Sequence, residues 1–202
     1  MKRYFFTVEF LLTDSDPELL SGRCISILHG FLKAHHLAGI GVCFPRWSNS
    51  TIGRVIGFVS TSREHLLSFR SQPYFENMSL GDFFSLSEVL AVPDDVGEVR
   101  FVRNQGIKKC FVGEKRRRLA RAKLRAEERG EVFDPTQLSF ERELEHFHRA
   151  VMDSQSTGER FVLHIQKQQV EGVLSFEFNH YGLATNEGWR GTVPELMGVV
   201  GT

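Results

Sequence analysis

The sequence predicts an α+β fold, and three observations support this. Segments in which apolar and more polar residues alternate indicate strands, and two segments with helix-start residues stand between them. Taken in order, residues 1–92 give β-α-β-β-α-β. With 202 residues, 41% apolar content and 18 Phe, the chain can bury a sizeable core. This order is that of a ferredoxin-like (RRM-like) domain, which many RNA-binding modules share but which alone fixes no function.

The first strand and the first helix have the clearest signals. The strand is indicated by alternating apolar residues, Tyr4, Phe6, Val8 and Phe10. Asp16, Pro17 and Glu18 combine a cap, a proline at the first helical position and an acid in the first turn. They predict a helix from there to about His36, ended by Gly39. Its buried face should hold Leu20, Cys24, Ile27, Leu28 and Phe31.

The rest of the N-terminal half completes the expected order. Strands are predicted over residues 40–44, before Pro45, and over residues 54–60. Thr61 and Glu64 form a potential capping box for a helix over residues 62–70. A fourth strand is expected within residues 84–92. Pro93 to Gly97 then reads as a boundary, so we predict a ferredoxin-like domain over residues 1–98 and an RNA-binding C-terminal domain over residues 99–202.

The C-terminal half is predicted to be an α/β part with an arginine-rich helix. A strand over residues 99–104 leads to a helix over residues 114–129, between Gly113 and Gly130. Asp134 and Pro135 indicate another helix. Its apolar stripe would comprise Phe140, Leu144, Phe147 and Val151. After a polar turn at residues 153–158, a strand through Phe161, Leu163 and Ile165 is expected to pair with residues 173–178.

Charge separates one stretch from the rest of the chain. Residues 100–129 hold 12 Lys/Arg against 3 Asp/Glu, a net charge of +9, whereas residues 1–99 carry −3 and residues 130–202 carry −6. The neutral total therefore hides a local cationic segment suited to a polyanion.

The basic helix lacks a broad apolar face. At 100° per residue, one stripe holds Arg118, Arg121, Arg125 and Arg129, and a second holds Arg116 and Lys123. Leu119 and Leu124 point in different directions. Guanidinium groups match phosphate oxygens, so the helix is better suited to lie against nucleic acid than in a core. The simpler alternative is a solvated helix whose charges confer solubility.

Several function classes lack their signatures. The chain has no Walker loop, HExxH, GxSxG or paired acidic motif, and its three Cys have no metal-ligand or disulfide spacing. We therefore expect no metal and no cofactor, and a reducing cytoplasm. No apolar run is long enough for a membrane span. Taken singly, His29, the hydroxyl residues before Gly158 and Tyr181 have ordinary structural explanations.

Four blocks together carry a family resemblance. They are IGVCFP after a His-bearing helix, RNQ followed by RRRLAR, then SQSTGERF, and then YGL. In this order and spacing they resemble the type I-F branch of the CRISPR-associated repeat endoribonucleases. The resemblance is best over residues 17–45, 99–125 and 154–183.

The resemblance implies an activity. Such enzymes cut the stem-loops of CRISPR repeats in precursor crRNA by attack of a ribose 2′-hydroxyl on the adjacent phosphate, without a metal. The products are a 2′,3′-cyclic phosphate and a 5′-hydroxyl. The enzyme then keeps the 3′ hairpin, as a subunit of a type I-F surveillance complex that serves defence or guided transposition. The expected partners are therefore the repeat RNA hairpin and the other subunits of such a complex, and no membrane.

The resemblance also assigns residues. His29 falls on the catalytic histidine, Ser154 on a substrate-positioning serine and Tyr181 on a tyrosine that orients the histidine. Arg103 and Gln105 match a pair that reads base edges, on one face of a strand, and Phe161 matches an aromatic that stacks on the terminal base pair. Ala122 stands where the family often has another arginine. The expected RNA-binding residues are Arg103, Gln105, Lys115, Arg116, Arg117, Arg118, Arg121, Arg125, Ser156, Thr157 and Phe161.

These residue types suit the chemistry. A histidine, whose unperturbed pKa is about 6.5, can remove a 2′-hydroxyl proton near neutral pH. His180 offers a competing proton acceptor. Two alternatives from other classes stay open at this point. The chain could be an RNA-hairpin-binding structural subunit that does not cut, or a DNA-binding regulator that uses the same helix.

Overall fold

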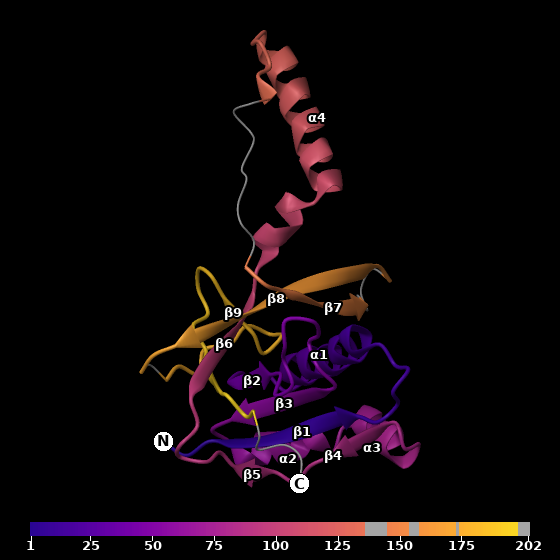
Figure 1. The fold of residues 1–202 in the computed structure, drawn as a ribbon, viewed down its shortest axis with the longest axis vertical. Coiled ribbons are helices and arrows are strands. Elements are labelled where there is room, and N and C mark those ends of the chain that lie inside the picture. The colour runs from indigo at the N-terminus through magenta and orange to yellow at the C-terminus, as the bar shows by residue number, and fades with distance from the viewer. Residues whose placement is uncertain (136–144, 154–157, 173, 198–202) are drawn as a thin grey trace.

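The computed structural model describes residues 1–135, 145–153, 158–172 and 174–197, which form two sheets, each with its own helices (Figure 1). The first part contains β1 (Tyr4–Phe10), α1 (Pro17–Ala34), β2 (Ile40–Cys43), β3 (Val55–Ser60), α2 (Arg63–Arg70), α3 (Pro73–Leu80), β4 (Phe84–Leu86) and β5 (Leu90–Ala91). The second contains β6 (Glu98–Arg103), the 3₁₀ helix η1 (Gln105–Cys110), α4 (Val112–Arg129), β7 (His148–Asp153), β8 (Arg160–Val170), β9 (Ala184–Thr185) and β10 (Val193–Pro194).

The first sheet has the strand order β2-β3-β1-β4, and each pair of neighbouring strands in it is antiparallel. The hairpin β2-β3 lies on one side of β1, and β4 and β5 pair with β1 on the other. The central register sets Phe6 opposite Phe58 and Val8 opposite Ile56. This confirms the α+β class and the ferredoxin-like order of the N-terminal half.

The first helix begins as expected. The Asp16 carboxylate caps it by accepting from the backbone N–H groups of Glu18 (2.9 Å) and Leu19 (3.4 Å), and Pro17 opens the first turn. The helix ends at Ala34, two residues before the expected end, and Gly39 takes a positive φ of 82° before β2. Its buried residues are Ser21, Gly22, Cys24, Ile25, Leu28, Phe31 and Leu32, so the expected Leu20 and Ile27 are only half-buried.

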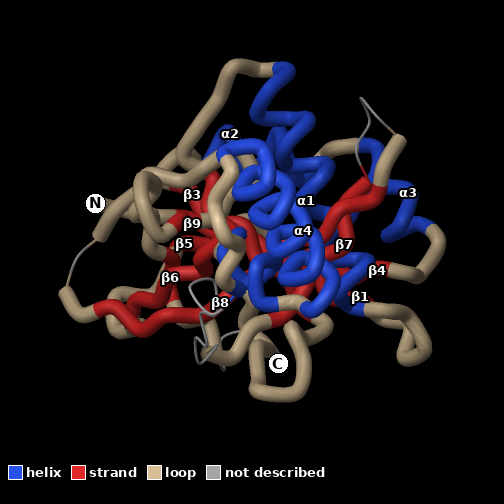
Figure 2. Tube along the Cα trace, turned by 90° about the horizontal axis from the view of Figure 1, so that it is seen from above, coloured by secondary structure: helices blue, strands red, loops and turns tan. Residues whose placement is uncertain are grey.

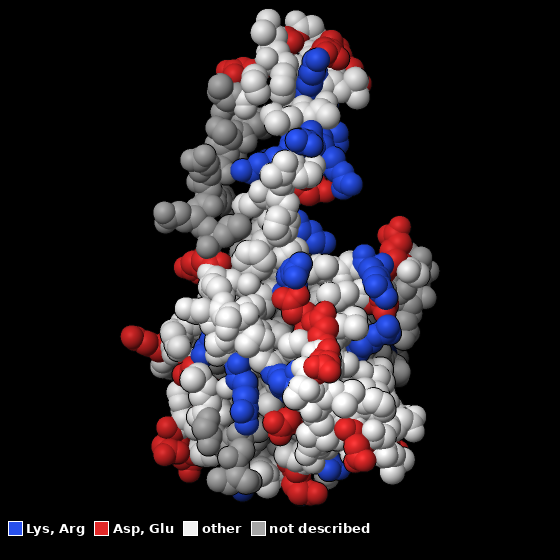
Figure 3. Space-filling model, turned by 45° about the vertical axis from the view of Figure 1, so that its right-hand side comes forward, with Lys and Arg blue, Asp and Glu red and all other residues white. Residues whose placement is uncertain are grey.

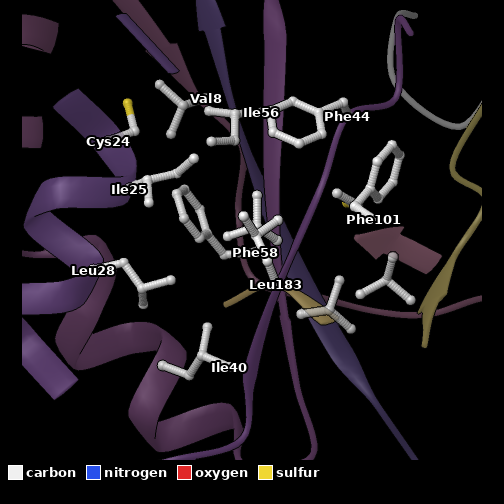
Figure 4. Packing of buried hydrophobic residues seen from close by; sticks show 14 of the residues in the cluster. Val8, Cys24, Ile25, Leu28, Ile40, Phe44, Ile56, Phe58, Phe101 and Leu183 are labelled. Atoms are coloured by element: carbon white, nitrogen blue, oxygen red, sulfur yellow. The ribbon is translucent and has the colours of Figure 1, made fainter. Parts of the chain in front are cut away.

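The core between the first sheet and its helices is rich in aromatic rings. Phe6 and Phe58 lie side by side on neighbouring strands, with ring centroids 5.2 Å apart. Phe31 of α1 and Phe69 of α2 meet at 5.2 Å over that layer, so both helices cover the same face. Figure 4 shows side chains of α1 packed against those of β1 and β3. Tilted and edge-on rings of this kind fill the core densely.

Three details of the first part differ from the sequence-based expectation. Ser62, not Thr61, caps α2, because its hydroxyl accepts from the His65 N–H (3.2 Å). The expected fourth strand is split into β4 and β5, since the Ser87 hydroxyl accepts from the Thr7 N–H (2.9 Å) where a strand carbonyl would otherwise do so. The helix α3 was not expected, although Pro73 stands in its first turn.

The second sheet has the order β10-β6-β8-β7, with β9 parallel to β6. Its strand β7 contains Val151, which we expected in a helix. Ala150 and Met152 are buried and Val151 is half-buried, which is strand alternation, and β8 supplies the hydrogen-bonding partner. The expected partner of β8 was also wrong, because residues 174–178 form no strand. Residues 136–144, which include Phe140 and Leu144, lie outside the described part of the chain.

The two sheets share one hydrophobic cluster. Phe44, just after β2, packs edge-on against Phe101 of β6, with ring centroids 5.0 Å apart. Figure 4 shows Phe101 and Leu183 beside the core of the first sheet. The Val42 N–H on the edge of β2 donates to the Gly182 carbonyl (2.8 Å). The C-terminal half is therefore packed against β2 and α1 rather than tethered by a linker.

The basic helix α4 projects from this body. Figure 1 shows it rising above the second sheet, and in the view from above it lies over β7, β8 and α1 (Figure 2). It begins two residues before the expected Glu114 and ends at Gly130, whose φ of 70° is the left-handed conformation of a helix end. Ala126 is its one buried residue, as the missing apolar face indicated. Among the helices described, none is long and apolar enough to cross a membrane.

Candidate active site and nucleic-acid interface

The centre of the candidate site is a stacked pair of rings. His29, half-buried on α1, lies against Tyr181 with ring centroids 4.9 Å apart and an interplanar angle of 17°. Its Nδ1 is 3.2 Å from the backbone carbonyl of His180. A carbonyl only accepts, so Nδ1 carries the hydrogen, and in the neutral ring Nε2 is left as a proton acceptor.

A tight turn presents Tyr181 to the histidine. The Asn179 side-chain oxygen accepts from the backbone N–H groups of Tyr181 (2.8 Å) and Leu183 (3.2 Å). Gly182 has a φ of 72°, and a Cβ there would lie 2.7 Å from Val42 and 2.8 Å from Leu28. Sequence reasoning missed Asn179. The signal was present in its type and spacing, since Asn often organises a turn two residues ahead.

Two further expected residues adjoin this pair. The Arg103 guanidinium, at the end of β6, lies over the Tyr181 ring at 4.9 Å from its centroid. Phe161, near the start of β8, is half-buried and edge-on to the same ring at 6.4 Å. Tyr181 thus links residues from α1, β6 and β8 that are far apart in the sequence. His180 is exposed, and its ring centroid lies 6.2 Å from that of His29.

The strand before the expected serine runs alongside α1. Three contacts follow one another in the same order along both elements: Glu18 with Arg149 (3.1 Å), Gly22 with Val151, and Ser26 with Met152 (3.7 Å). β7 therefore ends, at Asp153, beside the turn of α1 that precedes His29. The expected site residues Ser154, Ser156 and Thr157 lie outside the described residues.

Arg103 and Gln105 do not share a strand face as expected. β6 ends at Arg103, and Asn104 caps η1 by accepting from the Gly106 N–H (2.9 Å), so Gln105 is already helical. The strand rule of alternation therefore does not apply to them. Both residues nevertheless line one open hollow of about 720 Å³ between η1 and the segment that follows β9.

The expected cations of α4 are concentrated on an exposed arm. Figure 3 shows Lys and Arg side chains gathered on it. Arg117 and Arg121 form ion pairs with Glu114, at 2.8 and 3.9 Å. Within the described residues, no ion pair holds Lys115, Arg116, Arg118 or Arg125. Arg118 is half-buried, and the other three are exposed. This arm therefore offers cationic side chains, mostly guanidinium groups, to a large anion.

The chain is similar to one known protein family. The sequence model of one family, described as CRISPR-associated protein (Cas_Csy4), matches residues 10–196. The match spans the ring cluster, the hollow and α4 together. No curated protein matches the chain.

Proposed function

The chain belongs to the Csy4 family of CRISPR-associated proteins, which are CRISPR repeat-specific endoribonucleases, and we propose that it cleaves repeat stem-loops in precursor crRNA by metal-independent 2′-hydroxyl attack. The products are a 2′,3′-cyclic phosphate and a 5′-hydroxyl. The protein then stays on the 3′ hairpin as a subunit of a type I-F surveillance complex.

The observation that carries this mechanism is the fixed orientation of His29. Because its Nδ1 donates to the His180 carbonyl, its Nε2 is available to take the proton of the 2′-hydroxyl. The 2′ oxygen then bonds to the adjacent phosphorus, and the bond from phosphorus to the 5′ oxygen breaks. That oxygen takes a proton from water, and the protonated His29 later releases its own proton to water, which restores the neutral imidazole. Tyr181 orients the imidazole by stacking, and Ser154 positions the substrate.

RNA binding is divided between two regions in this proposal. The arginines of α4 bind backbone phosphates of the stem, as A-form RNA hides its bases in a deep, narrow major groove. At the base of the stem, Arg103 and Gln105 read base edges and Phe161 stacks on the last base pair. The ring cluster places Arg103 and Phe161 next to Tyr181, so this end of the stem would meet His29.

Incubation with candidate repeat RNA in EDTA tests the proposal. We expect one cut at the 3′ base of the stem and a 2′,3′-cyclic phosphate end. The matched control is the same hairpin with a single 2′-deoxy sugar at the scissile position, which should bind and stay intact because it lacks the nucleophile. A protein that only binds RNA would treat both alike. Cleavage of the deoxy hairpin, or preference for duplex DNA in competition, would overturn the proposal.

A further inference from the structure

The open hollow beside the ring cluster contains side chains that the proposed mechanism does not use. These are Lys109, Asn186, Glu187 and Trp189, which line the hollow together with Arg103 and Gln105. We propose that this hollow binds one unpaired nucleotide that flanks the repeat stem, with its base stacked on Trp189. This inference rests on the proposed function and adds a single-strand subsite to it.

Trp189 is held in place by a closed turn. The Thr185 hydroxyl accepts from the backbone N–H groups of Gly188 and Trp189, each at 3.1 Å. The Thr185 N–H in turn donates to the Trp189 carbonyl (2.9 Å). The Trp189 residue is nevertheless 44% exposed, although an aromatic side chain of this size normally gains from burial. An exposed aromatic on a hydrogen-bonded turn beside a polar hollow suits base stacking, which is a common way to bind single-stranded RNA.

The polar groups in the hollow fit a nucleotide. Asn104 is committed, because its side chain accepts from Gly106 (2.9 Å) and donates to Gln166 (2.7 Å). Lys109, Asn186 and Glu187 are exposed, and the structure gives their side chains no hydrogen bond or ion pair within its described residues. Amide and carboxylate groups can pair with base edges, and the ammonium of Lys109 can pair with a phosphate.

Position and size limit which nucleotide can bind. Arg103 lines the hollow and also lies over Tyr181, so the hollow adjoins the ring cluster. RNA whose stem ends at that cluster would have its next unpaired nucleotide within reach. A volume of about 720 Å³ is within the range of small-molecule sites, about 300 to 1,000 Å³, and is ample for one nucleoside.

Binding measurements with Trp189→Ala, and with Trp189→Phe as the matched aromatic control, test this subsite. The probes are two non-cleavable 2′-deoxy hairpins, one ending at the stem and one carrying its flanking unpaired nucleotides. We expect Trp189→Ala to weaken binding of the flanked hairpin by about 5- to 100-fold, which is the usual scale for losing one stacked base. Binding of the bare hairpin should be unchanged, and Trp189→Phe should retain most of the affinity. Replacing each flanking nucleotide by an abasic one should reproduce the loss at one position.

The outcomes separate this inference from the proposed function. If the unmodified protein fails to bind the bare hairpin, the proposed function fails. If it binds that hairpin and Trp189→Ala weakens both probes equally, or neither, the subsite is overturned. A thermal unfolding curve of Trp189→Ala matching the parent protein shows that the loss is not misfolding. Glu187→Gln provides a second variant, expected to change which flanking base is preferred without changing binding of the bare hairpin.

Discussion

At the scale of single residues, the hydrogen bond from His29 to a carbonyl determines which nitrogen would take the proton in the proposed mechanism. A histidine whose Nδ1 is committed presents Nε2 in one direction, and the stacked phenol ring restricts rotation of the imidazole. This arrangement needs no change of tautomer before proton transfer.

We therefore expect His29→Ala to slow cleavage by about 10²-fold or more, the usual scale for losing a general base, while hairpin binding is retained. Single-turnover cleavage and filter binding on the same RNA separate the two effects. His65→Ala on α2 is the matched control and should cleave normally. If His29→Ala cleaves at the parent rate, the role moves to His180 or elsewhere.

His164 on β8 should make stability depend on pH. It is buried, and burial first, then the nearby Lys108 and Arg149 cations, lower its pKa below the ordinary 6.5. The unfolded chain therefore binds a proton at a higher pH than the folded protein does. The stabilisation that comes from keeping His164 neutral is complete above pH 6.5. It is lost as the pH falls from 6.5 through the lowered pKa of the folded protein.

Urea unfolding at pH 7.5 and pH 5.5 measures this effect. We expect the parent protein to lose more free energy of unfolding on acidification than His164→Gln does, because the variant has no imidazole to protonate. An equal loss in both proteins would show that other groups account for the acid dependence.

Residue types were easier to predict than their partners. Resemblance assigned His29 and Tyr181 from the printed sequence, but it did not indicate that a backbone carbonyl fixes the histidine. Asn179 was missed because its function depends on the turn that its own side chain closes. Arg103 and Gln105 were wrongly placed on one strand face, since the end of β6 is set by the cap at Asn104.

At the scale of elements, α4 combines high charge with little contact to the body. Helix formers and Gly130 at its end were sufficient to predict it, although Gly113, which we expected before the helix, lies in its first turn. Its projection could not be predicted, because that depends on where η1 leaves the second sheet (Figure 1).

Replacing two of its arginines should weaken RNA binding through the backbone phosphates. We expect Arg118→Ala with Arg121→Ala to lower hairpin affinity and to make the salt dependence shallower, by about one unit of log–log slope for each phosphate that is no longer neutralised. Titrations at several salt concentrations measure the slope. Arg63→Ala, an exposed arginine on α2, should leave it unchanged. A parental slope in the double variant would remove α4 from the interface.

Packing of α1 against β7 depends on one glycine. A Cβ on Gly22 would lie 1.8 Å from the Val151 carbonyl oxygen, so a side chain there must push the two elements apart. Gly30, on the same helix, has no atom within 4 Å of its Cβ position and serves as a matched control.

We expect Gly22→Ala to lower the free energy of unfolding by about 1–3 kcal/mol, as overpacking does, and to slow cleavage because β7 ends beside the site. Gly30→Ala should be neutral or stabilising by up to about 1 kcal/mol, since Ala favours helices. Chemical denaturation and cleavage rates test both. Parental behaviour of Gly22→Ala would show that the packing of these two elements is easily relaxed.

The failed prediction around β7 has a physical reason. Phe147 and Val151 are spaced as on a helix, and Ala150 and Met152 alternate as on a strand, so local periodicity is ambiguous there. The pairing with β8 resolves it, with Met152 opposite Phe161. Such pairing depends on a partner distant in sequence, whereas the cap of α1 is encoded in three adjacent residues.

At the scale of the whole molecule, aromatic side chains join the two sheets. Phe101 of β6 is buried and contacts both Phe44, after β2, and Trp47, at ring centroid distances of 5.0 and 5.5 Å. The Arg3 guanidinium forms a half-buried ion pair with Glu98 across the same junction. The division at residues 98 and 99 remains a prediction, and these contacts argue that the two halves unfold together.

Phe101→Ala tests that coupling. Removing a buried phenylalanine ring should cost about 3–5 kcal/mol of unfolding free energy. Because this ring belongs to the second half and packs against rings of the first, we expect a single transition at lower urea, with circular dichroism and tryptophan fluorescence changing together. Phe83→Ala, at a residue that is already 42% exposed, should cost far less. Two separate transitions, with the first half unaffected by Phe101→Ala, would instead establish residues 1–98 as an independent folding unit joined to the cationic part by contacts of little energetic weight.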